Sequence, residues 1–182
     1  MELAGRASHH RGLEREAVPL LRSLAREVRL TCHLGILDGT EAVYLARVPF
    51  DSDIVVKSWV GKRFPLHSSA LGKVLLAWLP DPELDEMIKL IAFEARMPNT
   101  ITDAAIFRDH LGLVRKRGWA TDDEKQAPDL RCISAPVRDQ NNNVAAAVSA
   151  VGTTTQIGSR KPASRTRTGC ALPRTARCSS WS

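Results

Sequence analysis

Three side chains in the sequence are of the types that form a nucleophilic centre. Cys132, His67 and Asp122 could pair a thiolate with an imidazole and an orienting acid. Cys132, however, lies between Arg131 and Ile133 in a run typical of a core strand, where a cysteine is usually an inert small hydrophobic residue. We therefore predict that the chain is not an enzyme, and a small Cys/His enzyme is the less favoured alternative.

Two further patterns resemble phosphate or metal sites but lack residues that such sites need. Gly72-Lys73 matches the end of a phosphate-binding loop, yet His67 stands where the motif needs its first glycine and Val74 where it needs Ser or Thr. Successive side chains of the acidic run Asp122–Glu124 point to alternate sides of an extended segment, so they cannot converge on one ion. The cysteines form no C-x-x-C pair. The sequence therefore predicts neither a metal site nor a cofactor.

The net charge of +6 comes from the end of the chain rather than from a basic domain. All 20 acidic residues precede residue 158. Residues 158–182 are rich in Ser, Thr, Pro and Gly and hold the basic residues Arg160, Lys161, Arg165, Arg167, Arg174 and Arg177. This composition predicts a disordered basic tail, and we hypothesise a frameshifted or misassigned reading frame there.

The sequence shows no membrane or secretion signal. No run approaches the roughly 20 apolar residues that a membrane-spanning helix needs. The first 15 residues are polar and do not resemble a signal peptide. We therefore expect no membrane partner and a cytoplasmic location.

The first half of the body predicts one helix followed by a hairpin. Residues 1–15 resemble a linker remnant, and Glu16–Leu30 has apolar residues at helical spacing. Two strand-like runs follow, His33–Leu37 and Ala42–Val48, and Asp38-Gly39 between them suits a tight turn.

The remainder predicts helices between strands. The β-branched run Ile54–Val60 predicts a strand, and Ser68 or Ser69 would cap the helix that follows. The expected helices are Ser68–Leu79, Asp81–Phe93 and Thr102–Gly118, and a second hairpin is expected from Arg131–Arg138 and Val144–Val151. Strands in adjacent hairpins with helices elsewhere indicate an α+β fold with a mainly antiparallel sheet, spanning residues 16–157 as one domain.

Three stretches of this body resemble the effector-binding domain of the IclR family of bacterial transcription regulators. The first is the hairpin Leu37–Val48, and the second is Gly61–Ala77, which reads GKRFPLHSSALGKVLLA. The third runs from Gly118-Trp119 through Leu130–Val137 to Val144–Ser149. The resemblance covers about Ala17 to Thr153 and implies a GAF-like domain, with helices packed on the faces of its sheet.

The resemblance also implies a pocket for a small effector, a carboxylate or an aromatic metabolite. Free backbone N–H groups where the loop enters a helix at Ser68–Leu71 would suit a carboxylate. Asp122 could hydrogen-bond a hydroxyl or amine of the effector. By motif, the effector-binding residues are Phe64, Ser69, Ala70, Leu71, Asp122, Cys132 and Ser149.

Two positions depart from the family's pattern. Val151 stands where a second small polar residue is often found, and Asp129 replaces a glycine. Because a valine in the pocket wall removes a hydrogen-bond donor, we expect a more apolar effector.

The family resemblance implies a homodimer or tetramer. The residues before Glu16 are too few for a winged helix-turn-helix, so we expect contact with DNA only through such a domain of the full-length protein, absent from this chain. The expected function is effector sensing that controls DNA binding. A stand-alone ligand-binding module or a degenerate remnant is the alternative.

Overall fold

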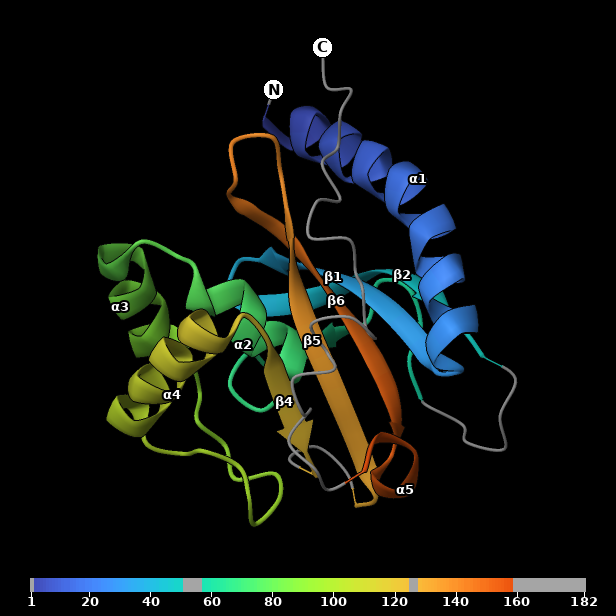
Figure 1. Ribbon diagram of the computed structural model, residues 1–182. Helices are drawn as coiled ribbons and strands as arrows, with labels where there is room; N and C mark the ends of the chain where they lie inside the picture. The colour runs from blue at the N-terminus through green and yellow to red at the C-terminus, as the bar shows by residue number, and fades with distance from the viewer. Residues whose placement is uncertain (1, 51–56, 125–127, 159–182) are drawn as a thin grey trace.

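The computed structural model describes residues 2–50, 57–124 and 128–158, with side chains from residue 12 onward. Its centre is a six-stranded antiparallel sheet of order β3-β2-β1-β6-β5-β4 (Figure 1). The strands are β1 (Thr31–Asp38), β2 (Glu41–Val48), β3 (Arg63–Phe64), β4 (Ala120–Asp123), β5 (Leu130–Arg138) and β6 (Val144–Thr153). The helices are α1 (Glu2–Val28), α2 (Ala70–Ala77), α3 (Asp81–Leu90), α4 (Ala104–Arg117) and α5 (Thr154–Ile157). The predicted α+β class is confirmed.

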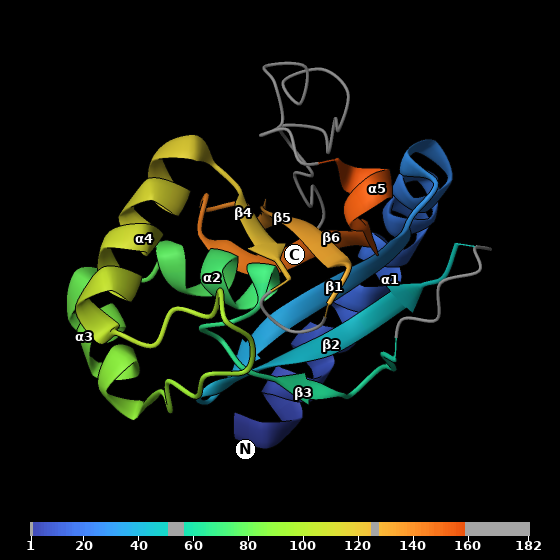
Figure 2. The same cartoon turned by 90° about the horizontal axis from the view of Figure 1, so that it is seen from below.

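Helices cover both faces of the sheet. α1 lies along one face, while α2 and α4 lie on the other, with α3 beside α4 (Figures 1 and 2). One buried cluster joins α1 to the sheet and includes Leu24 and Leu34. A second cluster joins α2 and α4 to the opposite face and includes Val74, Phe107 and Leu111. The sheet therefore separates two apolar cores.

β1 contributes side chains to both faces. Leu34 and Ile36 belong to the cluster beneath α1, and alternation directs His33 to the opposite face. A Cβ added to Gly35 would lie 3.3 Å from Leu71 Cδ1 of α2. The missing side chain at Gly35 thus lets α2 approach the sheet closely, which positions the start of that helix.

Both predicted hairpins are present. β1 and β2 are joined through Gly39, whose φ of 63° explains the glycine. In the β5–β6 turn, Asp139 Oδ1 accepts a hydrogen bond from the Asn143 amide at 2.8 Å, and Asn142 adopts a φ of 67°. α4 ends at Gly118 in the left-handed conformation, as its sequence predicts.

The predicted start of the first helix was wrong. α1 begins at Glu2 rather than Glu16 and ends at Val28 rather than Leu30. Leu13 is buried in the α1 cluster and extends the apolar spacing of Ala17 and Leu21 by one turn. Residues 2–15 are therefore helical, and their role as a linker stays a prediction.

Two other predicted boundaries need correction. Residues 57–60 of the expected strand Ile54–Val60 are not in a strand, and residues 54–56 lie outside the described residues. β3 pairs with β2 instead, after a turn at Gly61 with a φ of 85°. α3 starts at Asp81 as expected, but Pro80 rather than Asp81 is its N-cap, and the helix ends at Leu90 rather than Phe93.

The predicted tail lies outside the described residues from position 159 onward. Within the part of the chain that the structure describes, no helix combines the length and apolarity needed to cross a membrane.

Candidate functional site

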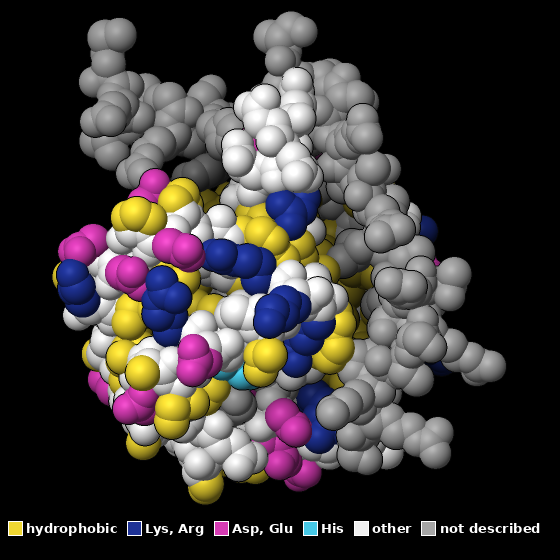
Figure 3. Space-filling view, turned by 60° about the vertical axis from the view of Figure 1, so that its left-hand side comes forward, with side chains coloured by type: hydrophobic (Ala, Val, Ile, Leu, Met, Phe, Trp, Pro, Cys, Tyr) yellow, Lys and Arg dark blue, Asp and Glu magenta, His cyan; other side chains and the backbone are white. Residues whose placement is uncertain are grey.

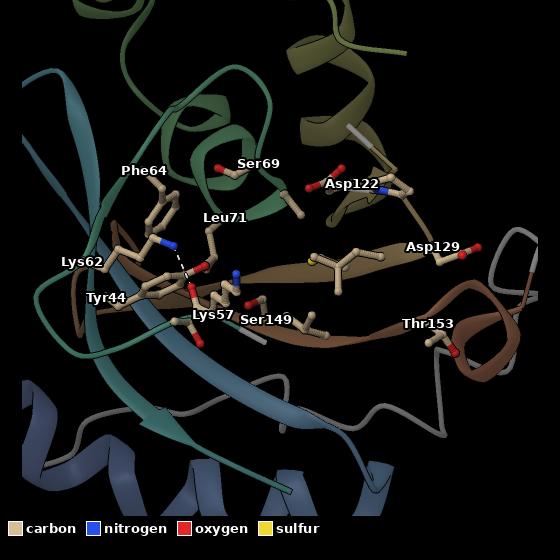
Figure 4. A pocket seen from close by; sticks show the side chains of 16 residues that line it. Tyr44, Lys57, Lys62, Phe64, Ser69, Leu71, Asp122, Asp129, Ser149 and Thr153 are labelled. Carbon is tan, nitrogen blue, oxygen red and sulfur yellow. Dashed lines mark hydrogen bonds between the residues drawn. The ribbon is translucent and has the colours of Figure 1, made fainter. Parts of the chain in front are cut away.

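A pocket of about 430 Å³ lies between the start of α2 and the adjoining face of the sheet (Figure 4). Its wall combines β2, the segment 57–64, the start of α2 and strands β4, β5 and β6. The structure places all seven residues predicted from the sequence in this wall: Phe64, Ser69, Ala70, Leu71, Asp122, Cys132 and Ser149. Side chains far apart in the sequence therefore meet around one space.

The start of α2 is held by local hydrogen bonds. Ser69 is its N-cap, and its Oγ accepts from the Gly72 amide and donates to the Pro65 carbonyl, both at 2.9 Å. The amides of the next two residues, Ala70 and Leu71, belong to the first helical turn and have no partner within the helix. Because both residues line the pocket, the positive end of the helix dipole faces it.

The floor of the pocket consists of rows of side chains across the sheet. One row runs from Asp122 to Cys132 and on to Val151, each paired with the next in register. The neighbouring row pairs Ser149 with His33 across β6 and β1. The floor therefore offers the Asp122 carboxylate on β4 and the Ser149 hydroxyl on β6. Val151, also on β6, lies in the same row as Asp122.

Two buried side chains of opposite charge, Asp122 and Lys73, act on Cys132. Asp122 is 2 % exposed and Lys73 is fully buried, with its Nζ donating to the Thr121 carbonyl at 2.9 Å. Burial raises the pKa of the Cys132 thiol well above its ordinary value; the Asp122 carboxylate raises it further, and the Lys73 ammonium lowers it. Cys132 is thus a neutral thiol at physiological pH, as an inert pocket residue would be.

Beside the floor, a polar network connects β1 and β2 to the segment after residue 56. His33 Nε2 and Ser58 Oγ are 2.7 Å apart, and Arg47 Nε donates to the same hydroxyl at 3.0 Å. The His33 ring stacks on Tyr44 with centroids 4.6 Å apart. Burial, reinforced by the Arg47 charge, lowers the pKa of His33 to about 4.

Sequence reasoning missed the part of the wall around Tyr44, Lys57, Ser58 and Lys62. A β-bulge in the β1–β2 pairing reverses the alternation of side chains along β2, so the sequence pattern does not reveal which face Tyr44 occupies. Lys57 and Ser58 lie within the segment that was predicted to be a strand, and Lys62 follows it. Their signal would have been the two lysines that flank a short turn ending in Gly61.

The structure does not assemble the alternative Cys/His centre. His67 does not line the pocket with Cys132 and Asp122. Its Nε2 is instead 3.0 Å from the Glu94 carbonyl oxygen, and its ring packs against Phe93. Among the residues the structure describes, no three His, Cys, Asp or Glu side chains are grouped as a metal site.

The surface over α3 and α4 carries interspersed charges rather than a basic patch (Figure 3). Arg108 pairs with Asp85 at 2.6 Å and Lys89 with Glu86 at 2.6 Å. This pattern does not resemble a nucleic-acid-binding face.

Residues 5–180 match the family model described as bacterial transcriptional regulator IclR C-terminal. The HTH-type transcriptional regulator RhmR of Escherichia coli is 38% identical over 157 residues, covering 86% of this chain. The chain spans only 60% of the length of RhmR.

Solved structures agree with this match. The C-terminal domain of the E. coli regulator KdgR superposes with a TM-score of 0.74 at 32% identity, covering 86% of this chain and 88% of that domain. An IclR homolog from Microbacterium hydrocarbonoxydans, solved with 4-hydroxybenzoate, gives a TM-score of 0.74 at 28% identity over 84% of this chain and 62% of that one. The family match and the shared fold together show that the chain belongs to the IclR family of bacterial transcriptional regulators, of which it contains the C-terminal, effector-binding domain.

Proposed function

We propose that the pocket binds a small acidic effector and that its occupancy controls how the full-length regulator binds DNA. The carrying observation is that the start of α2, Asp122 and Ser149 meet in one pocket of about 430 Å³. An IclR homolog solved with 4-hydroxybenzoate has the same fold, which supports an effector that combines a carboxylate with a hydroxyl.

The site chemistry suggests how such an effector would be oriented. Its carboxylate would accept hydrogen bonds from the first-turn amides of α2, where the helix dipole favours negative charge. Its hydroxyl would donate to Asp122 or exchange a hydrogen bond with Ser149. Val151 and Leu71 would contact the apolar part of the molecule, so aromatic acids should bind better than small 2-oxo acids.

Control of DNA binding would follow from linkage between two sites. An effector shifts the regulator between DNA-competent and DNA-incompetent arrangements only by its differential affinity for the two. We propose a cytoplasmic regulator that acts as a homodimer or tetramer and contacts DNA through a helix-turn-helix domain. We further propose that it is not an enzyme, because its relatives are transcriptional regulators and His67 does not line the pocket with Cys132.

A thermal-shift screen of the chain against benzoate, hydroxybenzoates and small 2-oxo acids tests the proposal. A ligand at about 100 times its Kd adds about 2.7 kcal/mol to the free energy of unfolding, which raises the Tm by roughly 5–10 °C. We expect Asp122→Ala and Ser149→Ala to lose most of this shift. The control Asp109→Ala removes an exposed carboxylate of α4 and should keep it.

A folded wild-type chain that shows no shift with any acid would overturn the proposed binding function. A Tm shift in Asp122→Ala and Ser149→Ala as large as that of the wild type would place the ligand outside this pocket. A response limited to the most polar acids would reject the preference for aromatic effectors.

A further inference from the structure

Two lysines give one end of the pocket a positive charge. Lys57 and Lys62 belong to the same short segment before β3, and both line the pocket. In Figure 4 they lie on the side of Tyr44, whereas Asp129 lies at the opposite end and Asp122 lies between the two ends. The pocket is therefore electrostatically asymmetric along its length.

The charge at the lysine end is not offset by neighbouring acids in the described ranges. None of the ion pairs found there includes Lys57 or Lys62. The carboxylate of Asp122, in contrast, shares its surroundings with the buried Lys73 ammonium, and the two act on Cys132 in opposite directions. Among the residues that the structure describes, the positive end of the pocket thus lacks the opposite charge that Asp122 has in Lys73.

The two lysines differ in what holds them. Lys62 Nζ donates to the main-chain carbonyl of Lys57 at 2.6 Å and lies over the Trp59 ring, 4.7 Å from its centroid. The Gly61 amide also donates to the Tyr44 carbonyl at 2.8 Å, which attaches this turn to β2. Lys62 is therefore a positioning residue for the segment. The exposed side chain of Lys57 is the one presented to a ligand.

We propose that Lys57 determines specificity by binding a second acidic group of the effector, so that the pocket prefers diacids to monoacids of the same shape. This inference rests on the proposed function, in which one carboxylate lies at the start of α2. A monoacid bound there would leave the Lys57 ammonium without a counter-charge from any described residue, whereas a diacid would supply one. Because Lys57 is exposed to solvent, we expect a preference of about fivefold, the upper range for an exposed ion pair.

Isothermal titration calorimetry of the chain with two matched pairs of acids tests this inference. Benzoate is compared with terephthalate, and valerate with glutarate, because each pair differs by one carboxylate. The variants are Lys57→Gln, which removes the charge, and Lys57→Arg, which keeps it. Lys116→Gln is the matched control, because it removes an exposed lysine of α4 outside the pocket.

We expect the wild type to bind at least one diacid about fivefold more tightly than its monoacid, and added salt to reduce the difference. Lys57→Gln should remove most of this preference, while Lys57→Arg and Lys116→Gln should retain it. A wild type without preference, or a preference unchanged in Lys57→Gln, would overturn the role of Lys57 and leave carboxylate binding intact. Failure of the folded wild type to bind any of the four acids would overturn the proposed function itself.

Discussion

His33 is an ionisable residue placed where its charged form is unfavourable. It is fully buried beside the pocket, with its Nε2 against Ser58 Oγ, and its Nδ1 has no hydrogen-bond partner among the described residues. Burial and the nearby Arg47 charge lower its pKa from 6.5 to about 4. The neutral ring is therefore part of the folded structure, and protonation favours the unfolded chain.

This pKa shift predicts a pH-dependent loss of stability. Between pH 6.5 and pH 4 the unfolded chain binds a proton at position 33 that the folded chain does not. The free energy of unfolding should therefore be highest above pH 6.5 and fall by about 3 kcal/mol as the pH drops to 4. Urea unfolding at pH 7.5, 6 and 4.5 measures this loss.

The matched variant is His33→Gln, which keeps a side chain able to hydrogen-bond Ser58 but cannot titrate. Its free energy of unfolding should decrease less across the same range, whatever its value at pH 7.5. Parallel pH profiles for the two proteins would show that another group causes the loss.

At the residue scale, the sequence predicted those side chains of the pocket wall that lie in recognisable family motifs. Leu71 and Asp122 lie in such stretches, and both line the pocket. Lys57 and Ser58 lie outside them and take their places through the turn at Gly61 and the contact with β2. Such tertiary placement leaves no periodic signal in a short irregular segment. Whether an effector contacts the seven predicted residues stays a prediction.

At the element scale, α2 depends on a glycine for its approach to the preceding loop. A Cβ added to Gly72 would overlap the main-chain carbonyl and Cα of Leu66, which cannot move as a side chain can. Gly112 of α4 is also within a helix, but a Cβ added there would meet nothing within 4 Å. The two glycines therefore have different physical roles.

The same substitution should act in opposite directions at these two positions. Gly72→Ala should lower the free energy of unfolding by about 3 kcal/mol through backbone displacement. Gly112→Ala should raise it by about 1 kcal/mol, because alanine has the higher helix propensity. Chemical denaturation of both variants tests this, and similar effects of the two changes would contradict the close contact at Leu66.

Element boundaries show where sequence patterns are sufficient. Gly118 marked the end of α4 because C-capping chemistry is local, whereas the N-cap is Asp103, one residue after the expected start at Thr102. The start of α1 was missed because Leu13 stands alone in a polar stretch. Only the contact of Leu13 with the α1 cluster shows that the helix continues through this residue. A single buried contact of this kind is a tertiary feature that helical periodicity does not report.

At the scale of the whole molecule, the two apolar clusters share the strands that separate them. Leu34 of β1 packs beneath α1, while Gly35 contacts α2 on the other face. Because the same strands serve both clusters, we expect the described domain to unfold in one cooperative transition.

Truncation of a core leucine on α1 tests this coupling. Leu24→Ala, at a side chain 6% exposed, should cost about 2–5 kcal/mol. Leu20→Ala, one turn away and 51% exposed, should change stability by less than about 0.5 kcal/mol. Circular dichroism and tryptophan fluorescence should follow the same unfolding curve in Leu24→Ala. Two separate transitions would show that the face under α1 unfolds independently.

The strand order also has a consequence for synthesis on the ribosome. β1 and β6 are central neighbours, so Leu34 pairs with Val148 from the far end of the domain. The β1–β2 hairpin is therefore synthesised before its partner strand β6. At bacterial translation speeds of about 5–20 residues per second, β6 follows on the order of ten seconds later. During that interval one edge of β1 has no strand beside it, which makes the nascent chain a natural client for chaperones that shield apolar strands.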